Sequence, residues 1–175
     1  MTTKAARMAR RRGHSLLGIY LNDHLAGATA GMGLARRMAA SAEPGSESAA
    51  TLRALTAEIA ADRAALVTVM TALGIQIRGY KVFGAWAGEK AGFLKLNGRL
   101  LTRSPLSGLE EAEILRLGVE GKAAGWRTLR VLAERDSRLD AARLDELLAR
   151  AARQSATLET VRVTAADRLL GDWSD

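Results

Sequence analysis

Proline is almost absent from this chain, and that feature restricts the fold more than any other. The two prolines, Pro44 and Pro105, leave long uninterrupted stretches on either side of them. Alanine, leucine, arginine and glutamate dominate those stretches, and all four are good helix formers. Aromatic residues make up only 4% of the chain, and the alternating β-branched and aromatic runs typical of strands are missing. The sequence therefore predicts an all-α protein.

Apolar residues recur at helical spacing in four long segments. The expected helices run from about Ser15 to Ala42, to about Ile77 after a turn at Glu43–Ser48, over Leu109–Ala133, and from an N-cap at Asp140 to about Leu170. Connections as short as the two expected turns are typical of αα-hairpins. We therefore expect a four-helix bundle built from two αα-hairpins.

The apolar spacing also predicts which side of each helix faces the core. In the second helix the inward positions are expected to be Leu52, Leu55, Ile59, Leu66, Val69, Met70 and Leu73. In the third helix they are expected to be Ile114, Leu117, Ala124, Val131 and Leu132, with Gly118, Gly121 and Gly125 beside them.

A glycine-rich segment, residues 79–104, separates the two predicted hairpins. Gly84, Gly88 and Gly92 recur every four residues, and Phe83 and Trp86 lie near one another on a helical wheel. Each glycine lowers helix propensity by about 1 kcal/mol, so such a repeat makes sense where another backbone approaches closely. We predict a long, partly helical crossover that packs across the bundle and offers a surface for self-association or for a helical protein partner.

The net charge of +7 is unevenly distributed. Residues 1–12 and residues 78–103 each carry +5, so the remainder of the chain carries −3. Residues 1–13 are therefore interpreted as a basic N-terminal arm, and residues 14–171 as a single helical-bundle domain. A basic run of this kind can track the phosphates of a nucleic acid, which is kept as an alternative partner.

The chain contains no cysteine, which excludes disulfides, cysteine zinc sites and thiol catalysis. No charge-free stretch reaches the roughly 18 residues that a membrane span needs, so no membrane span is expected. The N-terminus lacks a secretory cleavage pattern, and a cytoplasmic location is predicted.

Polar residues interrupt the apolar stripes of all four helices. Because burying an isolated charge costs several kcal/mol, such groups should pair with one another, take up a proton or bind an ion. Histidine and carboxylates from facing helices are ligands for iron, manganese or zinc. The candidate metal ligands are His24, Glu58, Asp62, Glu120 and Glu159. Arg162, in line with the apolar positions of the fourth helix, is predicted to pair with these carboxylates and take the place of a metal.

The two-hairpin pattern with central carboxylates and a histidine resembles the ferritin-like superfamily, over roughly Leu16 to Leu170. Di-iron members carry a glutamate on two helices and Glu-x-x-His on the other two. Here Glu58 is followed by Ala61 and Glu159 by Arg162 at the histidine positions. The resemblance therefore implies the bundle without the standard di-iron ligand set or its oxygen chemistry.

Neither a phosphate-binding glycine loop nor a nucleophile elbow occurs, and no catalytic residue is assigned. The leading hypothesis is a non-enzymatic, ferritin-like bundle that self-associates or binds a partner and needs no cofactor. Its core would hold a structural polar network. The alternative is a metal-binding or redox protein with a non-standard His/carboxylate site for iron, manganese or zinc between the helices.

Overall fold

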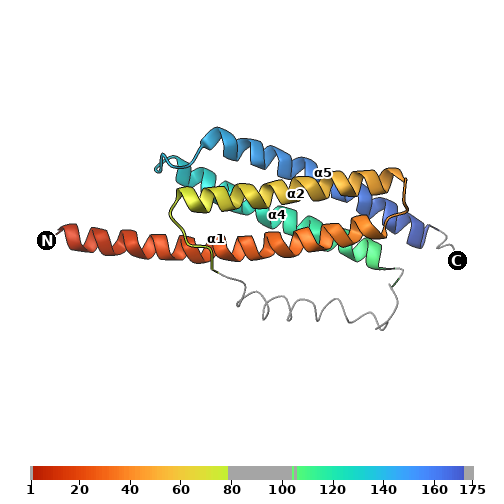
Figure 1. The fold of residues 1–175 in the computed structure, drawn as a ribbon, viewed down its shortest axis with the longest axis horizontal. Coiled ribbons are helices and arrows are strands. Elements are labelled where there is room, and N and C mark those ends of the chain that lie inside the picture. The colour runs from red at the N-terminus through yellow and green to blue at the C-terminus, as the bar shows by residue number, and fades with distance from the viewer. Residues whose placement is uncertain (1, 79–103, 105, 172–175) are drawn as a thin grey trace.

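Among the residues that it describes, the computed structural model contains four long helices and no strand. It describes residues 2–78, 104 and 106–171, with side chains from residue 16 onward. The helices are α1 (Thr2–Ser41), α2 (Glu47–Ala72), α4 (Ser107–Ala133) and α5 (Ala141–Leu170) (Figure 1). Over these described residues the prediction of an all-α protein is confirmed.

The four helices pack together side by side (Figure 1). α2 runs back along α1, and α5 runs back along α4; these two pairs share the longest interfaces. α1 also packs against α4, whereas α2 and α5 approach each other over a short region only. Within the described part of the chain, no helix is both long and apolar enough to cross a membrane.

The first helix begins much earlier than the apolar pattern predicts. α1 starts at Thr2 instead of near Ser15, so the backbone of the predicted basic arm is helical from residue 2. Alanine, arginine, lysine and methionine in this part are good helix formers, and the first glycine is Gly13. The first turns of α1 extend past the ends of the other three helices (Figure 1).

The second helix ends earlier than predicted, at Ala72 instead of near Ile77. Gly74 has a φ of +67°, a left-handed conformation that glycine adopts without strain. Its N–H donates to the carbonyl of Thr71 at 2.9 Å, and the N–H of Ile75 donates to the carbonyl of Met70 at 2.9 Å. This is a Schellman motif, and the burial of Ile75 beside Met70 completes it.

Side chains cap the starts of α2 and α5. The hydroxyl of Ser46 accepts the N–H of Ala49 at 3.1 Å at the start of α2. The carboxylate of Asp140 accepts the N–H of Arg143 at 3.0 Å, which confirms Asp140 as the N-cap of α5. Of the predicted crossover, residues 79–104, all but residue 104 lie outside the described residues, including Gly84, Gly88 and Gly92 of its glycine repeat.

The core follows the predicted stripe in α2 and departs from it in α4. Leu52, Leu55, Ile59, Leu66, Met70 and Leu73 are all buried, and Val69 is half-buried. In α4, by contrast, Ile114, Leu117 and Val131 are 42%, 72% and 59% exposed, so the prediction that they face inward is wrong. The residues of α4 that face the core are Ala112, Leu115, Val119, Ala123, Gly125, Trp126 and Leu129.

The reason for the error is that α4 carries two apolar stripes, each with helical spacing. The buried stripe contains Trp126, the largest side chain of the helix, which is 2% exposed. The other stripe faces outward and mixes large apolar side chains with small residues. Its members are Ile114, Leu117, Gly121, Ala124, Thr128 and Val131, and this set is called the outer stripe of α4 below.

Candidate functional site

Asp62 lies in the middle of α2 on its buried side, where it is 1% exposed. A carboxylate at this depth needs compensating charge, because an isolated buried ion costs several kcal/mol. Its Oδ2 accepts a hydrogen bond from Lys122 Nζ of α4 at 2.5 Å, and its Oδ1 accepts one from Arg150 Nε of α5 at 2.7 Å. Arg150 Nη2 also contacts Oδ1, without hydrogen-bond geometry. Asp62 therefore joins three helices through two cations.

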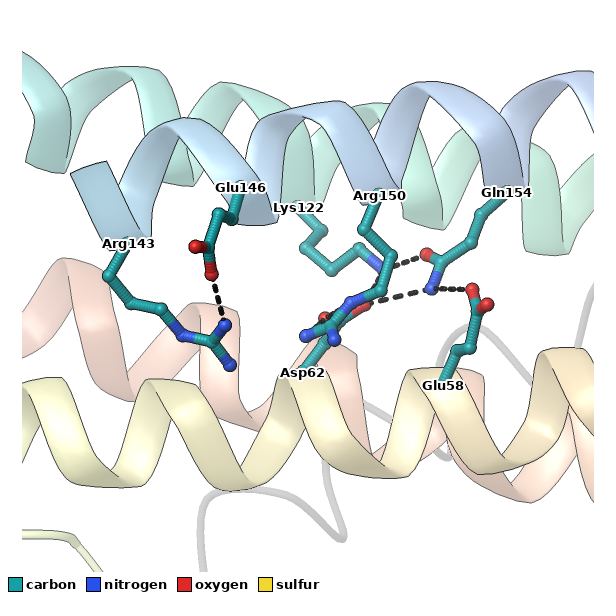
Figure 2. Close-up of polar contacts among 7 residues, drawn as sticks. All are labelled: Glu58, Asp62, Lys122, Arg143, Glu146, Arg150 and Gln154. Carbon is teal, nitrogen blue, oxygen red and sulfur yellow. Dashed lines mark hydrogen bonds and ion pairs between the residues drawn. The ribbon is translucent and has the colours of Figure 1, made fainter. Parts of the chain in front are cut away.

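Gln154 completes this network from α5, where it is also 1% exposed. Its amide nitrogen donates to Asp62 Oδ2 at 3.1 Å and to Glu58 Oε2 at 3.0 Å, and its amide oxygen accepts from Lys122 Nζ. Figure 2 shows these side chains converging between α2 and α5, with Lys122 reaching in from α4. We refer to Glu58, Asp62, Lys122, Arg150 and Gln154 as the polar network.

The formal charges of the polar network cancel, since it contains two carboxylates and two cations. Burial lowers the pKa of Lys122, while the charge of Asp62 and its hydrogen bond act in the opposite direction. The Lys122 side chain retains 15% exposure and that of Arg150 19%, so both heads lie at the edge of the core. Each carboxylate is bonded inside the network, so the arrangement is suited to joining helices.

The five predicted metal ligands do not gather in one place. Glu58 and Asp62 share the polar network, as their spacing on one helix face predicts. Glu120 is exposed, and its carboxylate accepts from the hydroxyl of Ser155 at 2.7 Å. Glu159 is paired with Arg162 at 2.7 Å and with Arg116 at 3.1 Å, at another level of the bundle.

His24 lies on the α1–α4 side of the bundle, away from these carboxylates. Its ring packs edge-on against Tyr20, with ring centroids 4.5 Å apart, and over the backbone of Gly125. Burial lowers the pKa of His24, and the nearby Asp23 offsets this only in part. Among the described residues, no group of three or more His, Cys, Asp or Glu side chains is placed to hold a metal ion.

Arg162 was predicted to pair with the central carboxylates, and the structure corrects this for Glu58, Asp62 and Glu120. Its guanidinium pairs with Glu159, one helical turn before it, and reaches Glu113 at 4.0 Å. Arg150 and Lys122 have the role that was assigned to Arg162, because they are the cations that come level with Asp62.

Three members of the polar network were not predicted from the sequence: Lys122, Arg150 and Gln154. For the two on α5 the sequence contained a signal. Arg150 and Gln154 are four residues apart on α5, and Gln154 interrupts the stripe between Ala151 and Leu158. Lys122 lies on the face of α4 that carries Trp126, so it is recognisable as an inward residue only once that face is chosen as the buried one.

A shallow apolar depression opens beside the outer stripe of α4. It has a volume of about 310 Å³ and is lined by Leu16, Leu17 and Tyr20 of α1 and by Thr128 of α4. The hydroxyls of Tyr20 and Thr128 lie 3.2 Å apart at hydrogen-bond distance. Leu16 is 63% exposed, so the apolar surface continues from α4 onto α1.

No family model matches this chain, and no curated protein or solved structure matches it either. Its function is therefore inferred from the geometry of the polar network and of the outer stripe.

Proposed function

We propose that this chain is a non-enzymatic helical-bundle protein that acts by self-association, with the polar network as a structural element of its core. The observation that carries the proposal is the outer stripe of α4. Leu117 at its centre is 72% exposed, and Ile114 and Val131 on either side are 42% and 59% exposed. Large contiguous apolar patches on soluble proteins mark sites of association.

The small residues of the outer stripe support the same proposal. A Cβ atom added at Gly121, or at the neighbouring Gly118, would have no other atom within 4 Å, so the described part of the chain leaves the space in front of them open. Glycines in a helix cost about 1 kcal/mol each in propensity. The close approach of another backbone over these positions would explain why glycines are present there. The same argument was applied above to the glycine repeat of residues 84–92.

The polar network supports a structural role over a catalytic one. Its carboxylates and cations are bonded to one another, and the depression beside α4 is lined by none of them. The metal-binding alternative rests on the sequence pattern, since its candidate ligands lie in separate parts of the described structure. The ferritin-like arrangement, with residues 79–104 as the crossover between two hairpins, remains part of the proposal and is supported by the order and packing of α1, α2, α4 and α5.

The test is the solution mass of the purified chain, measured by sedimentation velocity from low to high micromolar concentration. The wild-type chain is expected to form a species larger than a monomer. Leu117→Glu, which puts a charge at the centre of the outer stripe, should weaken that association at least about 100-fold because the carboxylate loses its water on association. Val163→Glu is the matched control, since Val163 is 50% exposed on α5. A wild-type chain that stays monomeric throughout would refute the proposal.

A further inference from the structure

We propose that the self-associated form is a two-fold dimer in which α4 packs antiparallel against α4 of a second copy, with the two helices closest at Gly121. The inference rests on the proposed function and specifies its partner and geometry. It follows from three properties of the described surface around the outer stripe: its charge distribution, its small central residues and the adjacent depression.

Charge favours the antiparallel orientation. The first half of α4 has a net negative charge, since Arg116 stands against Glu110, Glu111, Glu113 and Glu120. The second half is positive, with Lys122, Arg127 and Arg130, of which Arg127 is exposed. A parallel pairing would place like charges opposite each other, which is unfavourable. An antiparallel pairing places the acidic half of each helix against the basic half of the other.

The register follows from Gly121 at the two-fold axis. Residues equally far before and after Gly121 then come level, so Glu113 lies within about 3 Å of the level of Arg127 of the second copy, at 1.5 Å rise per residue. The two residues are 14 positions apart, about four turns, so they share one flank of the helix. In a two-fold antiparallel pair the same flank of each helix meets, which brings Glu113 and Arg127 together twice.

Shape supports the same register. Leu117 of one copy lies within about 1.5 Å of the level of Ala124 of the other, so a large side chain faces a small one at both symmetric positions. Ile114 comes level with Thr128 of the second copy, which borders the depression formed with Leu16, Leu17 and Tyr20. The exposed side chain of Ile114 thus lies opposite the apolar depression of the second copy. Because of the two-fold symmetry, this contact occurs twice in the dimer.

A charge-reversal series tests the orientation. Glu113→Arg and Arg127→Glu each place like charges opposite each other twice in the dimer, and each should weaken dimerisation roughly tenfold. The chain that carries both substitutions restores opposite charges and should dimerise like the wild type. In a parallel dimer the double variant would gain nothing over the single ones, and that result would overturn the proposal.

A cysteine variant tests the register, and the chain is suited to it because it contains no cysteine. Gly121→Cys should oxidise to a disulfide-linked dimer under mild oxidation, while Ala152→Cys on the exposed side of α5 should not. If the wild type dimerises and Leu117→Glu abolishes this, but Gly121→Cys stays unlinked, the proposed contact at Gly121 is wrong and the proposed function stands. If the wild type is monomeric and Gly121→Cys reacts slowly with a maleimide, the chain itself covers the stripe, and both proposals fail.

Discussion

Replacing Asp62 with leucine removes the buried carboxylate on which the two cations of the polar network, Lys122 and Arg150, converge. Removing one member of a buried ion pair costs about 3–5 kcal/mol, because the remaining charge stays buried without compensation. The Lys122 and Arg150 side chains retain 15% and 19% exposure, so both heads partly regain water when Asp62 is absent. We therefore expect a loss at the lower end, about 3 kcal/mol in the free energy of unfolding. For a chain of this size that lowers the melting temperature by roughly 6–12 °C.

The assay is urea unfolding followed by far-UV circular dichroism, with the slope of the transition checked for two-state behaviour. Asp145→Leu is the matched control, because Asp145 pairs with Arg130 at 3.0 Å but is 58% exposed. It should cost less than about 1 kcal/mol. An Asp62→Leu variant that loses no more than this control would refute the account of the polar network as a set of mutually compensating buried charges.

A second variant separates lost charge compensation from lost packing. Changing Glu58, Asp62, Lys122, Arg150 and Gln154 together to leucine or methionine removes both cations and both carboxylates of the polar network. Replacing a whole buried polar cluster by apolar residues is often neutral or stabilising. This chain should therefore be more stable than Asp62→Leu alone, and if it is not, uncompensated charge is not the cause of the loss.

Two further predictions concern the α1–α4 contact. Gly125→Ala places a Cβ 3.1 Å from the His24 ring, so we expect it to destabilise the fold by about 1–2 kcal/mol. In Gly118→Ala the added Cβ has no atom of another element within 4 Å, so this variant should stabilise the helix by up to about 1 kcal/mol in the same urea assay. Equal effects of the two alanine variants would contradict the close contact between Gly125 and His24. Because burial lowers the pKa of His24 below 6.5, the unfolded chain takes up a proton between pH 6.5 and that lower pKa while the folded chain does not. The urea midpoint should therefore fall as the pH falls through this range, and less steeply in His24→Gln; parallel pH profiles of the two chains would refute the assignment.

The success of the sequence prediction varied with the number of apolar faces on each helix. α2 has one apolar stripe, and its buried positions were read from the sequence with Val69 alone half-buried. α4 has two, and spacing alone does not say which of them faces the core. The end of α2 was missed for a local reason: Gly74 stops the helix, although the apolar pattern continues through Ile75 and Ile77.

The candidate site was predicted on one helix and missed on the other two. Asp62 and Glu58 were recognised because both lie on the apolar side of α2 at a spacing of four residues. Their partners depend on which residues of α4 and α5 come level with Asp62, and that is set by how the helices pack. Arg162 and Arg150 both lie on α5, but Arg150 is the one at the level of Asp62.

The two apolar stripes of α4 also give Lys122 a role beyond neutralising Asp62. Both faces of α4 carry large apolar side chains, so apolar spacing alone does not fix the rotation of the helix about its own axis. Lys122 lies on the face of Leu115 and Trp126 and not on that of Leu117. Only when that face turns inward does the ammonium group reach the buried carboxylate of Asp62. The ion pair thus favours the same rotation of α4 as the burial of Trp126, the rotation that leaves the outer stripe on the surface.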